Sequence, residues 1–260
     1  MSKPTLRAIL VSVDYGDFLE LSLSYNRHHF DEVMVVTTPT DQLSISVAEE
    51  NGAKVFCTDS FYDEEADFNK WKALEQGLDA YGRHGNICLM DADIFWPKKI
   101  PDWEIRKDCL YTPYCHIFHQ TKNGMPSEEQ WPSYGLRAHK LEFPGYTQIF
   151  NAKDAHLPKY PPWHQINWRH AGGADSFFQK RWRGNYRQRP PFYVLHLGQS
   201  GKNWCGRFTK YIDGTKPEEG MKKFTKLRGY MNKRRSVIRK DRKIHSHTYD
   251  HEKLPIKRND

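Results

Sequence analysis

The sequence predicts an α/β fold in which helices flank a mostly parallel sheet, followed by a basic C-terminal appendage. Near-continuous apolar runs alternate with helical patterns over the first hundred residues, as is typical of strands buried on both faces of a parallel sheet. The charge is also unevenly divided. Residues 221–260 carry 14 Lys and Arg against 4 Asp and Glu, whereas the rest of the chain carries 26 against 28.

The first half of the chain alternates regularly between strand and helix. In the helix expected at 67–81, apolar residues recur at every third or fourth position. Asn51-Gly52 and Gly82 are typical helix ends. Right-handed crossovers would place such strands in parallel. Strands are expected at 6–13, 32–39, 53–59 and 87–95, and helices at about 17–29, 40–51 and 67–81.

The second half is less regular and is rich in Pro, Trp, Tyr and His. Short antiparallel strands are expected at 107–115 and 146–152, a helix at 174–182 and a late strand at 192–198. Beyond Gly220 the pattern becomes basic helix or coil. The 260 residues therefore suit one large domain with an appendage.

Several classes of protein are disfavoured by composition. No stretch approaches the roughly 18 apolar residues that span a bilayer, and the N-terminus lacks the apolar region of a signal peptide. The five cysteines show no CxxC spacing and indicate free thiols in a reducing cytoplasm. We expect a cytoplasmic protein, in the host cytoplasm if viral. The histidines at 116, 119, 139, 164 and 170 do not have the spacing of a zinc site.

Acidic residues lie at the carboxyl ends of three of the predicted strands: Asp14, Asp59 and the pair Asp91 and Asp93. Ligands of parallel sheets bind beyond the carboxyl ends of the strands. Residues two apart in a strand face the same side, so Asp91 and Asp93 are expected to share one small volume. Two carboxylates there favour a divalent cation such as Mn²⁺ or Mg²⁺. The alternative is a solvated strand end.

The order of these elements resembles the nucleotide-sugar domain of GT-A glycosyltransferases. The stretch FNKWKALEQGLDAYG (68–82) is similar to the NKxxALNxGL helix of that family, and an apolar strand ending in Asp-Ala-Asp follows it. The resemblance covers about residues 5–207. It implies a GT-A (Rossmann-like) catalytic domain over residues 1–220, with a donor half at about 1–100 and an acceptor half at about 101–220.

The resemblance also implies roles for the residues at the strand ends. Asp91 and Asp93 would hold Mn²⁺ or Mg²⁺ on the diphosphate of a nucleotide-sugar donor, with a UDP-sugar favoured. Tyr15 would stack on the base. An Asn-Lys pair is also an ordinary helix start. The residues implied in nucleotide binding are Val13, Asp14, Tyr15, Asp59, Asn69, Lys70, Asp91 and Ala92.

The stretch INWRHAGGADSFFQKRW (166–182) resembles the acceptor-side WGGED segment of GT-A galactosyltransferases. The match implies that Asp175 is the general base that deprotonates the acceptor hydroxyl, with Gly172 and Gly173 beside the acceptor. We expect an inverting reaction. The sequence departs from the family at Ala174, where the family has Glu. The alternative is that Asp175 simply caps the following helix.

Two further stretches match the family in the expected order. In VLHLGQSGKNWCGR (194–207), His196 falls where many GT-A enzymes carry a third protein ligand to the metal. Gly198, Ser200 and Lys202 would lie near phosphate oxygens, and Trp204 would either cover the donor or pack. In FPGYTQIFNAKDAHL (143–157), the implied sugar contacts are Tyr146, Thr147 and Gln148.

The basic segment bears on the acceptor. Residues 222–243 hold eleven Lys and Arg and one acid, a composition that can follow a phosphate backbone. With this segment the chain resembles the phage enzymes that glycosylate hydroxymethylated pyrimidines in double-stranded DNA, and DNA is the favoured acceptor. The alternatives are a cell-surface polysaccharide or lipid acceptor, a solvated tail, and a non-catalytic nucleic-acid-binding protein on a GT-A scaffold.

Overall fold

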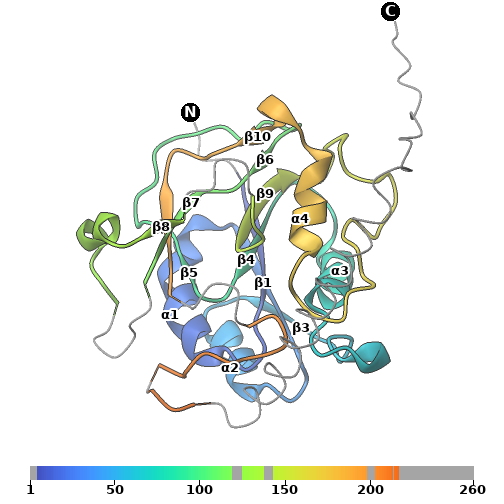
Figure 1. Cartoon of the computed structure of the whole chain (residues 1–260), viewed down its shortest axis with the longest axis vertical. Coiled ribbons are helices and arrows are strands. Elements are labelled where there is room, and N and C mark those ends of the chain that lie inside the picture. Colours follow the sequence, from blue (N-terminus) through green and yellow to red (C-terminus); the bar gives the residue numbers. More distant parts are fainter. Residues whose placement is uncertain (1–4, 119–124, 138–142, 198–202, 213, 217–260) are drawn as a thin grey trace, which may run out of the picture. The chain divides into compact units, whose positions relative to one another are not determined.

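The computed structural model describes residues 5–118, 125–137, 143–197, 203–212 and 214–216. Its centre is a seven-stranded sheet with the order β10-β6-β9-β4-β1-β2-β3 (Figure 1). Only β9 runs against the other six strands of this sheet, so the predicted mostly parallel α/β sheet is confirmed. The strands are β1 (Arg7–Val11), β2 (Glu32–Thr37), β3 (Lys54–Cys57), β4 (Asn86–Asp91), β6 (Leu110–Tyr111), β9 (Thr147–Asn151) and β10 (Arg187–Gln188).

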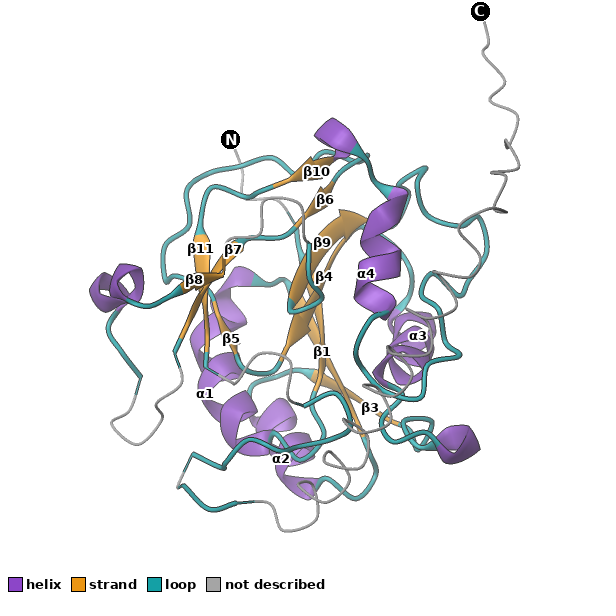
Figure 2. Cartoon of the chain, in the orientation of Figure 1, coloured by secondary structure: helices purple, strands orange, loops and turns teal. Residues whose placement is uncertain are grey.

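Helices cover both faces of this sheet (Figure 2). The helices α1 (Gly16–Asn26) and α2 (Gln42–Glu50) pack on one face, and α3 (Lys70–Tyr81) and α4 (Ala174–Phe178) pack on the other. Short 3₁₀ turns connect the elements. They span Arg27–His29, Asp63–Glu65, Glu128–Ser133, Gln179–Arg181 and Gly184–Tyr186.

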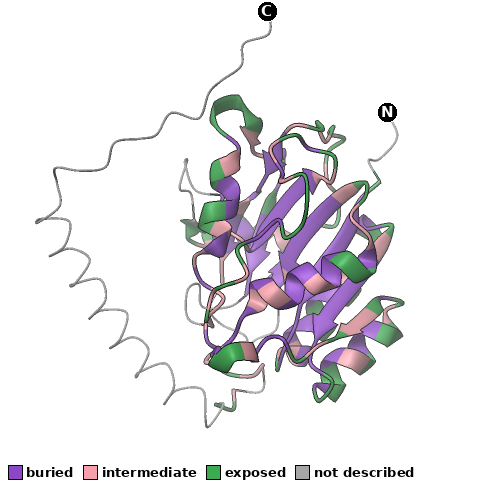
Figure 3. Ribbon diagram, turned by 90° about the vertical axis from the view of Figure 1, so that its right-hand side faces the viewer, coloured by how far each residue is buried: buried purple, intermediate pink, exposed green. Residues whose placement is uncertain are grey.

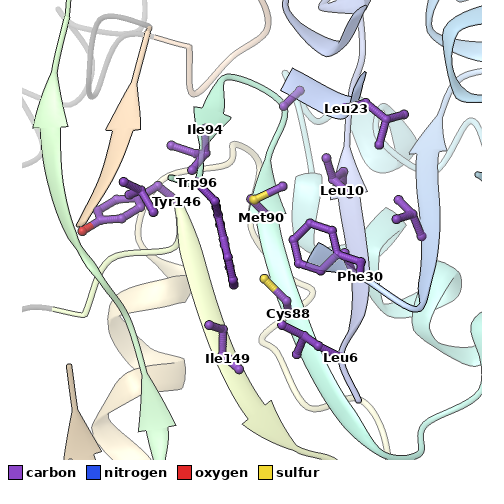
Figure 4. Close-up of a cluster of buried hydrophobic side chains, with 14 of the residues drawn as sticks. Leu6, Leu10, Leu23, Phe30, Cys88, Met90, Ile94, Trp96, Tyr146 and Ile149 are labelled. Carbon is purple, nitrogen blue, oxygen red and sulfur yellow. The ribbon is translucent and has the colours of Figure 1, made fainter. Parts of the chain in front are cut away.

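The alternation of side chains along β1 divides the core into two layers. Leu10 lies in the cluster shared with α1 and α2, whereas Ile9 lies in the cluster shared with α3 and α4. Figure 3 shows the central strands largely buried and exposed residues on the outer sides of the helices. Figure 4 shows the first cluster, in which Trp96 lies among the side chains of β4 and β9.

A second, four-stranded sheet has the order β5-β11-β7-β8. Its strand β11 pairs in parallel with β7 and antiparallel with β5. This pairing joins a late segment of the chain to the residues that directly follow β4. The strands are β5 (Ile94–Phe95), β7 (Tyr114–Ile117), β8 (Leu136–Arg137) and β11 (Tyr193–His196).

Two predicted strands are corrected by the structure. The strand expected at 87–95 is interrupted, because β4 ends at Asp91, the chain turns at Ala92 and Asp93, and β5 begins in the other sheet. The strand expected at 107–115 likewise divides into β6 and β7. Pro113 lies between them and has no N–H to continue a ladder.

A buried polar network fixes the loop that leads to α4. The Glu75 carboxylate on α3 accepts hydrogen bonds from the backbone N–H groups of Trp163 and His164, both at 2.9 Å, and from Arg83 at 2.8 Å. The His164 ring pairs with the same carboxylate and stacks between Trp71 and Phe178. Buried charges of this kind are stable only when they are fully paired. The network therefore holds residues 163–164 against α3.

All the described residues belong to one compact unit. The predicted basic segment lies outside the described residues, and its role stays a prediction. None of the helices in the described ranges is both long and apolar enough to cross a membrane.

Candidate active site at the carboxyl ends of the strands

The candidate site lies where the strand order of the central sheet reverses. From β1 the chain proceeds outward to β2 and β3, and then returns to β4 on the other side of β1. Such a switch point leaves a crevice beyond the carboxyl ends of the two central strands. Asp91, the last residue of β4, pairs in register with Val11, the last residue of β1. Asp91 therefore lies at the edge of the sheet that the sequence predicts for the acidic pair.

Asp93 reaches the site by a different route from the one expected. Strand alternation does not bring it beside Asp91, because the chain turns at Ala92 and Asp93. The turn is held from outside: the Ser22 hydroxyl donates to the carbonyl of Ala92 at 2.5 Å, and the Leu197 N–H donates to the carbonyl of Asp93 at 3.0 Å. Ala92 is buried, so any contact it makes with a nucleotide stays a prediction.

His196 is brought to Asp93 by the second sheet. It pairs with Ile94 across the β5–β11 ladder, which places its Nε2 atom 3.2 Å from Oδ2 of Asp93. Both side chains are less than a tenth exposed. Burial opposes the charged form of His196, but the Asp93 carboxylate raises the pKa of the imidazole well above its ordinary value. Burial likewise opposes ionised Asp93, and His196 nevertheless keeps the pKa of Asp93 below its ordinary value.

Asp91 has a different cationic partner. The ammonium of Lys70, the first residue of α3, forms an ion pair with its Oδ1 atom. Burial raises the pKa of Asp91, and the Lys70 charge acts in the opposite direction. Each carboxylate of the Asp-Ala-Asp motif therefore has its own cation, Lys70 for Asp91 and His196 for Asp93.

The donor set fits a divalent cation such as Mn²⁺. Two carboxylates and one imidazole suit such an ion, and Asp93 and His196 are already in contact through Nε2 of the imidazole. The Asp91 carboxylate is nevertheless already paired with the Lys70 ammonium. Within the described ranges, no group of three acidic, histidine or cysteine side chains is already arranged to hold a metal ion. Metal binding by Asp91, Asp93 and His196 stays a prediction.

Asp175 is connected to the acidic pair through the backbone. Its Oδ2 atom accepts from the N–H of Gly145 at 2.8 Å, and the carbonyl of the next residue, Tyr146, accepts from the N–H of Asp91 at 3.0 Å. Its Oδ1 atom accepts from the N–H of Ser176 at 2.8 Å. The N-cap residue of α4 is Gly173, and Asp175 lies in the first turn, where its carboxylate satisfies the N–H of Ser176. Its role as a base stays a prediction.

The three implied sugar-contact residues are buried, which corrects the expectation for two of them. Thr147 and Gln148 are fully enclosed, and each bonds to a nearby backbone carbonyl. They have no surface to offer a sugar, because β9 is an interior strand between β4 and β6. Tyr146 is 4% exposed, and its hydroxyl donates to the carbonyl of Pro113 at 2.5 Å.

The segment after β1 is held by an arginine that the sequence reasoning did not assign. The Arg207 guanidinium donates to the carbonyl of Asp14 at 2.6 Å and forms an ion pair with Asp17. It also lies 4.6 Å from the ring centroid of Tyr15, whose hydroxyl is 2.9 Å from Oγ1 of Thr209. The ring of Tyr15 is thus packed within the protein, and its stacking on a base stays a prediction.

Other implied nucleotide contacts have structural roles or stand apart. Asn69 is the N-cap of α3, accepts from the N–H of Lys72 and donates to the carbonyl of Ile166 at 2.7 Å. Val13 is buried, and Asp59 is exposed beyond β3. Gly198, Ser200 and Lys202 lie outside the described residues.

Asp41 was also missed by the sequence reasoning. Its side chain caps α2 and accepts from the N–H of Asp14, which adopts a left-handed φ of 57°. The Asp after Pro39-Thr40 is a typical N-cap signal, so this helix start was readable from the sequence. Its contact with Asp14 was not, because it joins residues 27 positions apart.

The Gly-Gly pair before α4 is required by two tryptophans. A Cβ on Gly172 would lie 2.6 Å from Cδ2 of Trp204, and a Cβ on Gly173 would lie 2.9 Å from the ring of Trp168. Gly173 also adopts a φ of 106°, which L side chains rarely adopt. Trp204 therefore packs on the loop before α4, which is one of the two roles that the sequence left open.

Gly172→Ala is expected to destabilise the protein by about 1–3 kcal/mol, because overpacking forces Trp204 or the loop to shift. Gly135→Ala is the matched control, since no atom lies within 4 Å of its added Cβ, and we expect a change within about 0.5 kcal/mol. Urea unfolding followed by tryptophan fluorescence measures both. Equal shifts of the two midpoints would contradict the close packing of Trp204 on Gly172.

The comparisons with known proteins find only distant similarity, and only to solved structures. No family model and no curated protein matches the sequence. Among solved structures, glucosyl-3-phosphoglycerate synthase from Mycobacterium tuberculosis, determined with Mn²⁺ and UDP, is 13% identical over 75% of this chain and 73% of that one, with a TM-score of 0.42. The inositol-1-phosphate CTP transferase from T. maritima is 10% identical over 77% and 92%, with a TM-score of 0.45.

A third structure is covered only in part. Mannosyl-3-phosphoglycerate synthase from Rubrobacter xylanophilus is 17% identical over 47% of this chain, with a TM-score of 0.32, and the match spans 44% of that protein. Function is therefore inferred from the site itself.

Proposed function

We propose that residues 1–220 form the catalytic domain of a metal-dependent GT-A glycosyltransferase, which moves a sugar from a nucleotide-diphosphate sugar to a hydroxyl group. The observation that carries the proposal is the position of Asp91 at the end of β4, with Asp93, which pairs with His196, in the turn directly after it, at the β1–β4 switch point. Parallel sheets bind nucleotides at such a point. Buried carboxylates held close together at a crevice are also typical of functional sites.

In this proposal the donor is a nucleotide sugar, with UDP favoured, and Mn²⁺ or Mg²⁺ is bound by Asp91, Asp93 and His196. A divalent cation there would neutralise charge on the leaving diphosphate. The residues of the chain supply the position: the β5–β11 ladder fixes His196, and the end of β4 fixes Asp91. The loop between β1 and α1, fastened by Arg207, forms the neighbouring wall for the nucleoside.

Asp175 is proposed as the general base. Its carboxylate is half-buried and is oriented by the N–H groups of Gly145 and Ser176. A carboxylate held in this way can accept the proton of an acceptor hydroxyl as that oxygen attacks the sugar carbon. A direct attack assisted by one base would invert the configuration at that carbon.

The proposed acceptor is hydroxymethylated DNA, and this part of the proposal depends on the charge of residues 221–260 alone. Polycationic segments bind DNA mainly through its phosphates. A polysaccharide or lipid acceptor would need no such affinity, so binding to duplex DNA distinguishes the two classes.

The donor reaction is tested by incubating the protein with a panel of nucleotide sugars, with and without Mn²⁺, and identifying released nucleotide by mass spectrometry. We expect Mn²⁺-dependent release with at least one donor. Asp93→Asn should lower this release by about 100-fold or more, because several kcal/mol of charge stabilisation are lost. Asp102→Asn, an exposed acid beyond β5, is the control and should retain full release. If no donor released nucleotide, the proposed glycosyltransferase activity would be contradicted.

Asp175→Asn tests the base. The amide oxygen of Asn can still accept from Gly145, while the bond from Ser176 and the basicity are lost. We expect transfer to an acceptor to fall by about 100- to 10,000-fold, and nucleotide affinity, measured by calorimetry, to stay at the wild-type value. A parallel loss of nucleotide affinity would show that Asp175 has a structural role instead.

The DNA interaction is tested in the full chain by replacing Lys233, Arg234 and Arg235 with Gln. If these side chains contact phosphates, affinity for duplex DNA falls and the slope of log affinity against log salt decreases by about 2 to 3. Gel shifts over a range of salt concentrations measure both quantities. An unchanged slope would remove the support for a DNA acceptor.

A further inference from the structure

The ion pair between Lys70 and Asp91 is the feature of the site that metal binding does not explain. Asp91 is one of the proposed metal ligands, yet its carboxylate is held by an ammonium from the same chain. The Lys70 side chain is 13% exposed and that of Asp91 is 34% exposed. The Lys70 ammonium is therefore largely withdrawn from water while the Asp91 carboxylate is partly exposed, and the attraction between them is stronger than between charges in bulk water.

The start of α3 delivers Lys70 to this position. Asn69 caps the helix and also donates to the carbonyl of Ile166, so the first turn is fixed at both sides. The Lys70 ammonium lies 5.2 Å from the ring centroid of Trp71. Among the described residues, Asp91 is the only carboxylate within 4.0 Å of it. The Lys70 charge also acts on Asp93, whose pKa it helps to lower.

Release of this pair leaves a charge without a partner. When Asp91 binds a metal ion, the ammonium of Lys70 loses the carboxylate that compensates it. A largely buried, unpaired ammonium is unfavourable, and breaking such a pair costs more than the pair itself contributes. The diphosphate of a donor would supply oxygen atoms that accept the released ammonium. The flexible four-carbon stem of lysine allows this exchange while the helix stays in place.

We propose that Lys70 couples the binding of metal and nucleotide: it holds Asp91 closed in the free protein and transfers to the diphosphate when metal and nucleotide bind together. This inference rests on the proposed function. Its consequence is that either ligand alone binds weakly, and each strengthens the other by the same factor. Lys70 is thus a positioning residue for the metal site as well as a contact for the nucleotide.

The test measures binding rather than turnover. The dissociation constant of Mn²⁺ is determined by electron paramagnetic resonance of free Mn²⁺, without and with UDP, and corrected for the Mn²⁺ that UDP binds in solution. In the wild type, UDP should strengthen Mn²⁺ binding by about tenfold or more. In Lys70→Gln, Mn²⁺ alone should bind more tightly than in the wild type, and the factor due to UDP should fall close to one.

Lys72→Gln is the matched control. It removes the same charge from the same helix, but Lys72 pairs with Asp63 and Glu64 instead of the acidic pair of the site. This variant should retain the wild-type Mn²⁺ affinity and the wild-type coupling. If both glutamine variants strengthened Mn²⁺ binding equally, the effect would be one of net charge and the proposal would be wrong.

Lys70→Arg provides a measurement that does not remove the cation from the largely buried pair. A guanidinium can hold a carboxylate through two hydrogen bonds, so Mn²⁺ alone should bind more weakly than to the wild type. Wild-type Mn²⁺ affinity in both Lys70 variants would overturn the role of Lys70 while leaving the proposed function intact. A wild type that bound neither Mn²⁺ nor UDP would instead refute the proposed function.

Discussion

The site depends on the charge compensation of two carboxylates, one at the end of β4 and one in the turn that follows it. Asp91 ends β4 at the middle of the sheet, and Asp93 follows within a single turn. The Asp93 side chain is buried and that of Asp91 is partly exposed, so water screens their repulsion less than it would at an open surface. Two cations from distant segments compensate these charges: Lys70 at the start of α3 pairs with Asp91, and His196 at the end of β11 pairs with Asp93. The acidic pair therefore depends on the start of α3 and on the second sheet for the cations that compensate its charge.

The remaining contacts keep these segments in register. The β5–β11 ladder holds His196 opposite Ile94, so the imidazole contacts Asp93, the residue just before β5. Arg207 fastens residues 207–210 to the loop after β1 through Asp14 and Asp17. Glu75 holds residues 163–164 against α3. Arg207 and Glu75 are buried charges with several partners each, an arrangement that fixes one geometry because partial satisfaction is costly.

The two halves of the proposed reaction are connected by a short path. Asp175 bonds to the N–H of Gly145, and the neighbouring residue Tyr146 accepts from the N–H of Asp91. The candidate base and the candidate metal ligands therefore share one backbone segment, and a shift of either would be felt by the other. Trp204 packs on Gly172, in the loop that leads to Asp175 and α4. Such direct connections suit a site in which donor and acceptor must be aligned within a fraction of an ångström.

The sequence by itself determined the alternation of strands and helices, the parallel sheet and the edge at which Asp91 lies, because these follow from apolar runs, helix ends and the right-handed crossover. It also led to Lys70 and His196, through their place in the order of motifs. Tertiary structure alone decided their partners, since Lys70–Asp91 and Asp93–His196 join residues 21 and 103 positions apart. It also enclosed Thr147 and Gln148, whose burial depends on the strands on either side of β9. Local pattern specifies elements, whereas contacts between distant segments depend on how those elements pack.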